Sequence, residues 1–344
     1  MTDPFESTTA MFTEAREAGA AVARLLGTNR AKIAALATTL RARHVRLVVT
    51  CARGSSDHAA SYGKYLFETM LALPVVSAAP STASLFGAPA GGGPDTLCIA
   101  ISQSGRSPDL LATVDAWQCA GAHVVALVND ETSPLALRAD TMIALSAGPE
   151  RSVAATKSCI AAMAGLAAIV AAVADDAGFA DAVVALPARL EKAFDEDWRA
   201  MSTALVSATS LFVVGRGYGF GIAQEMALKL KETCALHAEA FSAAEVRHGP
   251  MTIVGPGFPV LAIAGSDASG ESVRVAAADF AGRGARVLLA DAIIGGVLPA
   301  AKAHPALEPI LMLQSFYRAA NALSLARGLD PDAPPHLAKV TQTV

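Results

Sequence analysis

The chain has 344 residues, of which 53% are hydrophobic and 17% are charged. At roughly 150 residues per domain, this length predicts about two domains. The high apolar fraction excludes disordered and fibrous proteins. The net charge of -4 provides no chain-wide basic field, so neither nucleic acid nor an anionic membrane is expected as a main partner. A small anionic ligand stays open, because local backbone dipoles bind anions without net charge.

The longest apolar run extends from Cys159 to Ala174 and ends at Asp175 and Asp176. It is about one helical turn short of a bilayer span, so we interpret it as a buried core helix. The N-terminus carries an early Asp and Glu and lacks the basic and apolar stretches of a secretory signal. A cytoplasmic protein is therefore expected.

The cysteines lie far apart and form no CxxC pair; they are Cys51, Cys98, Cys119, Cys159 and Cys234. Cys234 and His237 are close in sequence but lack the further ligands that a zinc site needs. We expect no metal and no disulfide framework, and we interpret the cysteines as small buried hydrophobic residues in a reducing compartment.

Helices and strands alternate along the first half of the chain. Residues 4–43 show helical spacing of Ala and Leu, and Leu47–Thr50 is a short run typical of a buried strand. The elements expected next are a strand at Thr96–Ile101, a helix at Pro108–Ala120 and a strand at His123–Val128. This alternation is typical of a doubly wound parallel sheet.

The same order returns in the second half at an offset near 163 residues. The expected elements are strands at Leu211–Val214, Pro259–Ala264 and Arg286–Leu289 and a helix near Glu271–Gly282. Leu47 maps to Leu211, Leu97 to Val260 and Val124 to Val287, which indicates a duplicated unit. We predict an α/β protein of two similar doubly wound, flavodoxin-like parallel sheets. The predicted boundaries are N-terminal helices at 1–43, domains at 44–175 and 199–330, a helical linker at 176–198 and a tail at 331–344.

Two turns of the first half follow a strand and open a helix, where free N–H groups and the helix dipole attract anions. In residues 51–57, Gly54 permits a sharp turn, and Ser55 and Ser56 offer hydroxyls; a simple N-cap is equally compatible. Residues 102–108 (SQSGRSP) combine three hydroxyls, a flexible Gly and a Pro. Such a turn can surround a phosphate, and a polar capped turn is the alternative.

The second half of the chain shows neither a matching phosphate turn nor a nucleotide-binding motif. The counterpart turn at 265–267 contains Asp267, which would repel phosphate, so the two halves have specialised. Residues 215–221 place Phe220 where GxGxxG needs its third Gly, and no GxxxxGK[ST] occurs. The sequence therefore does not indicate a nucleotide site.

The helix expected at Gln224–Leu236 places Glu225, Lys229 and Glu232 on one face. An exposed ion-pair ladder is one interpretation, and a site with a general base is the other. The downstream segments 237–240 and 245–251 are rich in titratable groups, and we assign them to a loop, which favours a site. A histidine side chain can exchange protons in catalysis, which makes His248 a candidate, and a structural role is equally compatible.

These motifs together resemble the SIS (sugar isomerase) domain family, and within it the isomerase portion of glutamine:fructose-6-phosphate amidotransferase and the stand-alone glucosamine-6-phosphate deaminases. The resemblance covers nearly the whole chain. It rests on MFTEAREA (11–18), RGSS (53–56), SQSGRSPD (102–109), ERSVAATKS (150–158), ALKLKETCALHAEAF (227–241), EVRHGPM (245–251) and HLAKVTQTV (336–344), in family order.

The resemblance implies a site without cofactor or metal. It assigns the phosphate to Ser102, Gln103, Ser104 and Ser107, and the sugar to Gly54, Ser55, Ser56 and the segment around Val153 and Ala155. It also implies that Glu232 moves a proton between C1 and C2 and that Lys229 assists at the hydroxyls. His248 would promote ring opening from the neighbouring subunit of a homodimer, and Lys339 would reach the substrate carbonyl; a solvated tail lysine is the alternative.

Three residues depart from the synthase pattern: Ser107 replaces Thr, Arg106 replaces a frequent Glu, and Ala155 replaces Ser. Only about 45 residues precede the first strand, so we expect no glutamine-hydrolysing domain. The resemblance implies a glucosamine-6-phosphate deaminase, working in either direction with free ammonia. A related aldose/ketose phosphate isomerase or amino-sugar-phosphate deglycase, and a sugar-phosphate sensor without catalysis, are the alternatives.

Overall fold

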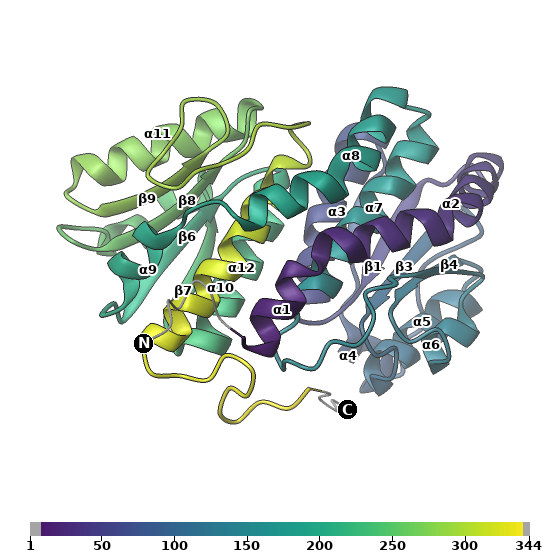
Figure 1. Cartoon of the computed structure of the whole chain (residues 1–344). Helices are drawn as coiled ribbons and strands as arrows, with labels where there is room; N and C mark the ends of the chain where they lie inside the picture. The colour runs from purple at the N-terminus through teal and green to yellow at the C-terminus, as the bar shows by residue number, and fades with distance from the viewer. Residues whose placement is uncertain (1–7, 340–344) are drawn as a thin grey trace. The chain divides into compact units, whose positions relative to one another are not determined.

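The computed structural model describes residues 8–339, which divide into two compact units, each with its own parallel sheet (Figure 1). The first unit comprises residues 20–149 and 158–184, and the second comprises residues 8–19, 150–157 and 185–339. Two segments from the N-terminal half of the sequence therefore belong to the unit of the second sheet. The predicted domain boundaries stay a prediction, and residues 340–344 of the predicted tail lie outside the described range.

The sheet of the first unit is entirely parallel and has the order β2-β1-β3-β4-β5. Its strands are β1 (Leu47–Cys51), β2 (Val75–Ser77), β3 (Thr96–Ser102), β4 (His123–Val128) and β5 (Thr141–Ala144). This is the flavodoxin-like order, which confirms the predicted fold class. Every residue of β3 and β4 is buried, as expected of parallel strands that are covered on both faces.

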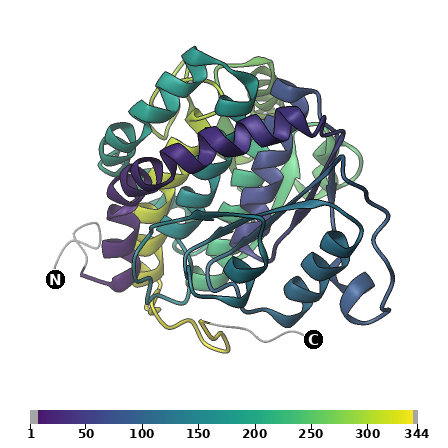
Figure 2. The ribbon, with the colours of Figure 1, turned by 90° about the vertical axis from the view of Figure 1, so that its right-hand side faces the viewer.

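Helices cover both faces of this sheet. They are α2 (Ala18–Ala42), α3 (Ser55–Leu71), α4 (Pro80–Ser84), α5 (Pro108–Cys119), α6 (Pro134–Arg138) and α7 (Lys157–Ala174). The purple α2 lies on one side of the sheet and the blue-teal α5 and α6 on the other, as the two views show (Figure 1, Figure 2).

Helix α7 is the one helix within residues 8–339 that is long and apolar enough to cross a membrane, and 83% of that stretch is buried inside the fold. A Cβ atom added at Gly165 would lie 3.1 Å from Leu127 of β4 and 3.6 Å from Leu25 of α2. Small residues let the helix approach this closely. The interpretation of this segment as a buried core helix is confirmed.

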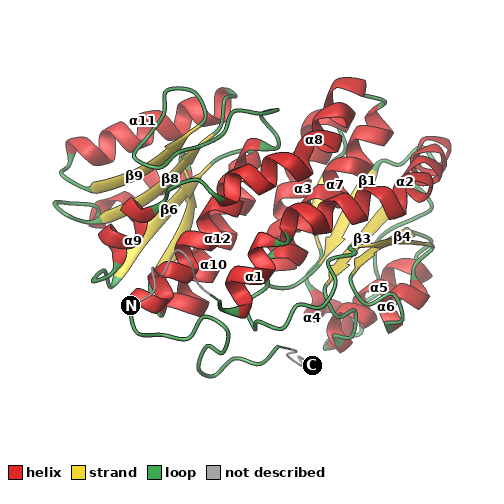
Figure 3. Ribbon diagram, viewed as in Figure 1, coloured by secondary structure: helices red, strands yellow, loops and turns green. Residues whose placement is uncertain are grey.

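The second unit has the sheet order β7-β6-β8-β9, again parallel. Its strands are β6 (Ser210–Gly215), β7 (His237–Ser242), β8 (Pro259–Ala264) and β9 (Arg286–Asp291). The remaining helices of the chain are α1 (Ala10–Arg16), α8 (Ala177–Phe194), α9 (Arg199–Leu205), α10 (Tyr218–Cys234), α11 (Ala268–Gly282) and α12 (Glu308–Ala326). Helix α11 packs on one face of this sheet, and α10 and α12 lie on the other (Figure 3).

Strand β7 corrects the assignment of residues 237–240 to a loop. Its residues His237, Glu239 and the alanines have low strand propensity, but all six pair with β6. Pairing at the sheet edge outweighs the intrinsic preference of these residue types. Helix α10 likewise begins at Tyr218, six residues earlier than expected, with Gly219 and Gly221 inside it.

The two units repeat one another in detail. Helices α3 and α10 both have 17 residues; the glycine before each has positive φ, 54° at Gly54 and 57° at Gly217, with ψ at -131° in both. Both helices end at an alanine in the left-handed conformation, Ala72 and Ala235. These equivalences keep the offset near 163 residues and support the duplication.

Four of the cysteines are buried, whereas Cys119 is exposed. The interpretation of all five as buried residues is therefore wrong for Cys119, which lies at the last position of α5. Burial raises the pKa of the Cys51 thiol to about 12 and that of Cys234 to about 11, and it also raises the pKa of Cys98. Buried thiols that stay protonated are poor nucleophiles.

We expect one fast-reacting thiol per folded chain. With a chromogenic disulfide reagent at pH 8, Cys119 should react first and the buried cysteines only after unfolding in urea. Cys119→Ser is the matched variant and should remove the fast phase. A fast phase that survives this substitution would contradict the burial described above.

Gly54→Ala should lower the free energy of unfolding by about 1–3 kcal/mol, because L-residues rarely adopt its backbone conformation. Open space surrounds a Cβ at this position, so the loss reports the backbone alone. Gly27→Ala, inside α2 and equally uncrowded, is the control and should be stabilising by about 0.5–1 kcal/mol. Urea unfolding of both variants measures the difference; equal values would show that Gly54 is not strained.

Candidate functional site

The loop between β3 and α5 is the predicted phosphate loop, and local contacts hold its shape. The Ser102 hydroxyl accepts a hydrogen bond from the Gly105 N–H at 2.9 Å. Gly105 has a φ of 63°, and a Cβ there would lie 2.3 Å from the Ser133 hydroxyl. Ser107 precedes α5 in an extended conformation and makes no capping hydrogen bond through its side chain. The first turn of α5 therefore keeps its N-terminal dipole facing this loop.

Two charged pairs surround the phosphate loop. Arg106, at the tip, contacts Asp130 at 2.7 Å in the turn after β4. Hydrogen bonds from Thr132 and Arg106 lower the pKa of Asp130. The departure from the synthase pattern at Arg106 is thus accommodated by an ion pair with the next loop.

The second pair joins the two predicted binding loops. Nε and Nη2 of Arg53 lie 3.0 and 2.6 Å from Oδ2 of Asp109, whose side chain is 1% exposed. Arg53 directly precedes Gly54, Ser55 and Ser56, and Asp109 lies in the first turn of α5. The guanidinium thereby neutralises a carboxylate that would otherwise repel a phosphate at this helix N-terminus.

The equivalent loop of the second unit is filled by the protein itself. Asp267 caps α11 by accepting hydrogen bonds from the Gly270 N–H and the Ser269 hydroxyl. The buried carboxylate of Glu308 accepts a hydrogen bond from the Ser266 N–H at 2.7 Å. A carboxylate from α12 thus uses the loop amide that an anion would need, which gives the specialisation of the halves a physical cause.

Glu225, Lys229 and Glu232 lie together on α10 as predicted, but they do not form an exposed ladder. The side chains of Glu225 and Lys229 are 0% and 1% exposed, and that of Glu232 is 22% exposed. The Lys229 ammonium lies 3.4 Å from Oε1 of Glu225 and contacts Oε2 of Glu232. Tyr317 of α12 donates a hydrogen bond to Glu225 at 3.0 Å. The cluster therefore exposes one carboxylate, that of Glu232, to solvent, and the buried ammonium of Lys229 holds this carboxylate in place.

Glu232 lines a cavity of about 250 Å³. This cavity is lined by the end of α10 and, from the tail, by Leu329, Asp330, Pro334, Pro335 and Leu337. Along the part of the tail that the structure describes, residues 328–339 contain no helix or strand. The tail is thus a cover over this end of α10.

Lys339 and the segment 150–157 also meet within the second unit. The Lys339 ammonium donates a hydrogen bond to the Ser152 carbonyl at 2.6 Å and lies 3.5 Å from Oε2 of the buried Glu150. The Val153 N–H donates to the Asp332 carbonyl at 3.1 Å. Lys339 therefore lies against the segment that contains Val153, although the two are far apart in the sequence.

Helix α1 supports the same segment. Glu14 accepts hydrogen bonds from the N–H groups of Arg151 and Ser152, and Glu17 pairs with the buried Lys157 at 2.5 Å. Burial raises the pKa of Glu14, with a further contribution from the nearby Glu150 charge. The motif MFTEAREA contributes to the family resemblance, but the sequence does not indicate that its carboxylates bind the segment 150–157.

His248 is exposed and follows the 3₁₀ turn Glu245–Arg247. It lines a cavity of about 510 Å³ at the carboxyl ends of β6 and β7, whereas Glu232 lines the cavity below the tail. His248 and Glu232 thus line two different cavities. Sharing of His248 between subunits stays a prediction.

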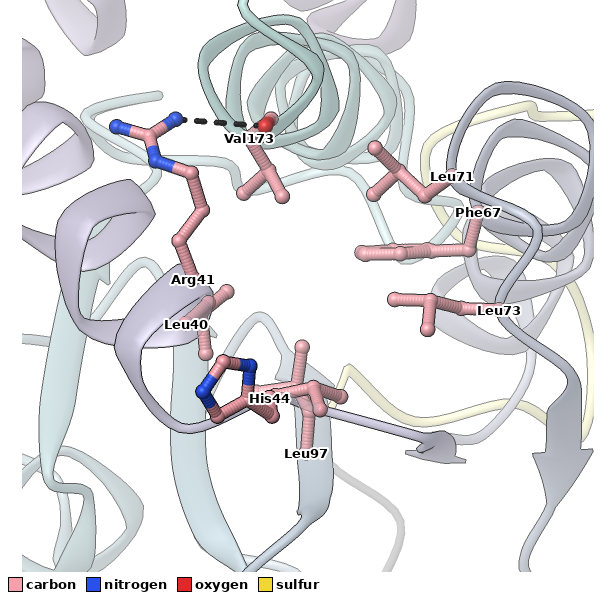
Figure 4. A pocket seen from close by; sticks show the side chains of 9 residues that line it. Leu40, Arg41, His44, Phe67, Leu71, Leu73, Leu97 and Val173 are labelled. Atoms are coloured by element: carbon pink, nitrogen blue, oxygen red, sulfur yellow. Dashed lines mark hydrogen bonds between the residues drawn. The ribbon is translucent and has the colours of Figure 1, made fainter.

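The pocket in Figure 4 contains none of the predicted site residues. It has a volume of about 190 Å³; Phe67, Leu71 and Leu73 lie on one side of it, and Leu40 on the other. Arg41 donates a hydrogen bond to the Val173 carbonyl at 3.3 Å at its rim. Leu97 places the pocket at the amino end of β3, opposite to the edge of a parallel sheet where ligands bind.

Sequence reasoning missed the residues that hold the site residues in place, above all Asp109, Glu150 and Tyr317. Asp109 carried a usable signal, because the loops after the adjacent strands β1 and β3 end at one edge of the sheet. Glu150 and Tyr317 carried none, since only the folded chain brings them to Lys339 and Glu225. Within residues 8–339, no three His, Cys, Asp or Glu side chains are grouped to hold a metal ion.

Lys229→Met should lower the free energy of unfolding by about 3–5 kcal/mol, because it leaves the buried Glu225 carboxylate without its ammonium partner. Lys231→Met, an exposed lysine on the same helix, is the matched control and should stay within about 0.5 kcal/mol of the parent chain. Urea unfolding compares the two. Equal effects would mean that the buried cluster contributes no more than a surface charge.

Comparison with known proteins finds relatives whose sequences align with most of this chain. A glutamine–fructose-6-phosphate aminotransferase (isomerizing) of Aeropyrum pernix is 34% identical over 319 residues, which cover 86% of this chain and 50% of that relative. The chain spans about half the length of the curated relatives it matches.

Solved structures share the fold. A proposed phosphosugar isomerase from Silicibacter pomeroyi DSS-3 is 41% identical, with a TM-score of 0.90, covering 94% of this chain and 100% of that one. Glucosamine-6-phosphate deaminase from Thermotoga maritima is 21% identical, with a TM-score of 0.77, covering 97% and 100%, and shows similarity of fold alone. The SIS domain profile matches residues 39–172 and 204–292. With two parallel sheets and two matched segments, this chain belongs to the SIS domain family and contains two such domains in tandem.

Proposed function

We propose that the chain is a phosphosugar isomerase that acts on hexose or hexosamine 6-phosphates, and that its reaction is the isomerising deamination of glucosamine 6-phosphate. Water and glucosamine 6-phosphate would give fructose 6-phosphate and ammonia. The observation that carries this proposal is the α10 cluster, in which a buried ammonium anchors one partly exposed carboxylate, Glu232. The names of the full-length relatives support the substrate class.

The proposed chemistry needs one group that takes and returns a proton. In the open-chain aldehyde, Glu232 would remove the proton from C2, and the released electron pair would form the C1–C2 double bond. The π pair of the carbonyl would move onto O1, which takes up a proton, and the product is an enolamine. Return of the proton to C1 gives a ketimine at C2, which water hydrolyses to the ketone and ammonia. A positioned carboxylate is suited to such a transfer between adjacent carbons. Lys229 would hold the carboxylate and assist at the sugar hydroxyls.

The remaining residues would bind and orient the sugar phosphate. We assign the phosphate to the loop of Ser102, Gln103, Ser104 and Ser107, where the Ser107 side chain is not used as a helix cap. Gly54, Ser55, Ser56 and Val153 would contact the sugar. Ala155 offers no hydroxyl, so one polar contact of the synthase pattern is absent and a different substituent can be accommodated.

Lys339 and His248 would serve the carbonyl and the ring. The Lys339 ammonium is held by the Ser152 carbonyl and Glu150, which places it beside Val153, a predicted sugar contact. His248 lies at the surface of the second SIS domain, and we propose that it enters the site of a second subunit in a homodimer. A dimer with two-fold symmetry would complete both sites in the same way.

Glu232→Gln should reduce kcat for the release of ammonia and fructose 6-phosphate by about 10²- to 10⁴-fold, with little change in KM, because the amide preserves shape but cannot accept the proton. Glu191→Gln on α8, also an exposed carboxylate, should leave both parameters unchanged. The assay measures both products from glucosamine 6-phosphate, with fructose 6-phosphate plus glutamine as a parallel reaction.

Full activity of the Glu232→Gln protein would show that another group moves the proton. If glucosamine 6-phosphate raises the melting temperature of the unmodified chain but no product forms, the protein is instead a sugar-phosphate sensor. Product formation from another hexose 6-phosphate alone would retain the isomerase and replace the substrate.

A further inference from the structure

The repeat places an arginine at equivalent positions of both SIS domains but gives it different partners. Arg53 follows β1 and pairs with the carboxylate of Asp109. Its counterpart Arg216 follows β6, and its Nη1 donates a hydrogen bond at 2.6 Å to the hydroxyl of Ser272, the counterpart of Asp109. The partner in the second domain is therefore neutral, and the interaction with Ser272 leaves the charge of Arg216 uncompensated.

Arg216 lines the same cavity of about 510 Å³ as His248. Arg247 and Ser272 lie in the lining too, together with Glu271 and small apolar residues. This volume falls within the range of small-molecule sites, roughly 300–1,000 Å³. The cavity lies where β6 and β7 end and α10 and α11 begin, the edge at which open parallel sheets bind ligands.

The carboxylates near the cavity have partners of their own. Glu271 lies 3.0 Å from Nε of Arg274, which also reaches Asp291. Asp279 lies 3.3 Å from Arg283 and 3.9 Å from Arg247, so its charge is shared between two guanidinium groups. Asp267 is used as the cap of α11. Arg247 thus shares the carboxylate of Asp279 with Arg283, whereas Arg216 forms no ion pair with a carboxylate among the described residues.

We propose that this cavity is a second anion site of the chain and that it takes the phosphoryl group of a small phosphorylated molecule. Arg216 would bind the phosphoryl oxygens, Ser272 would donate its hydroxyl, and Arg247 would add charge from the 3₁₀ turn after β7. Arginine suits this task because its planar fork matches phosphate oxygens. The site goes beyond the proposed function, which places the substrate phosphate in the first SIS domain.

Binding of inorganic phosphate, measured by equilibrium dialysis with radiolabelled phosphate, tests the site in the full chain. The parent for this test carries Ser104→Ala, which weakens the proposed phosphate loop of the first domain. Ser272→Asp restores the Arg–Asp pair that the first domain already accommodates and should weaken phosphate binding about tenfold or more. Arg216→Met should have the same effect. Arg189→Met, an exposed arginine on α8, should leave binding unchanged, and melting temperatures verify that each variant is folded.

Equal phosphate binding by the parent, Ser272→Asp and Arg216→Met proteins would overturn the proposal, as would a similar loss in Arg189→Met or the absence of binding at millimolar phosphate. Failure of the proposed function has a different signature. If the first domain does not bind phosphate, the Ser104→Ala parent binds as much phosphate as the unmodified chain. Ser272→Asp in that parent still reduces the binding.

Discussion

Parallel pairing is the constraint on which the arrangement of this chain depends. Each parallel strand needs a crossover before its neighbour can be added, and in both SIS domains helices supply these crossovers on the two faces of the sheet. As a result, the loops that follow β1 and β3 end at one edge, as do those that follow β6 and β8. The predicted binding segments therefore meet at this edge, although RGSS and SQSGRSPD are nearly fifty residues apart in the sequence. Arg53 can consequently contact Asp109.

Several buried charges of this chain are held in ion pairs. Lys229 lies between two glutamates, Lys157 pairs with Glu17, and Glu150 contacts Lys339. Such groups cost several kcal/mol of desolvation, and a hydrophobic replacement of similar volume is often as stable. Stability alone therefore does not explain them. Their common effect is to fix side chains and carbonyl groups of segments that the proposed function places around the sugar.

The two halves show how one scaffold diverges by single substitutions. Gly54 and Gly217 keep the same backbone conformation, and the helices after them have the same length. Yet Asp109 corresponds to Ser272, and the loop of the second domain that matches the phosphate loop binds the carboxylate of Glu308. The backbone conformation at these turns is therefore the same in both halves, whereas the side chains at the loop ends differ.

The sequence by itself determined the fold class, the duplication and the position of most strands and helices, because apolar periodicity and glycine at sharp turns are local signals. It also placed Glu225, Lys229 and Glu232 on one helix face. Tertiary structure alone decided that Lys229 is buried, that residues 237–242 form an edge strand, and that Lys339 meets Ser152 and Glu150. These outcomes depend on neighbours far away in the chain, and no local spacing encodes which segments will exclude water from a charge.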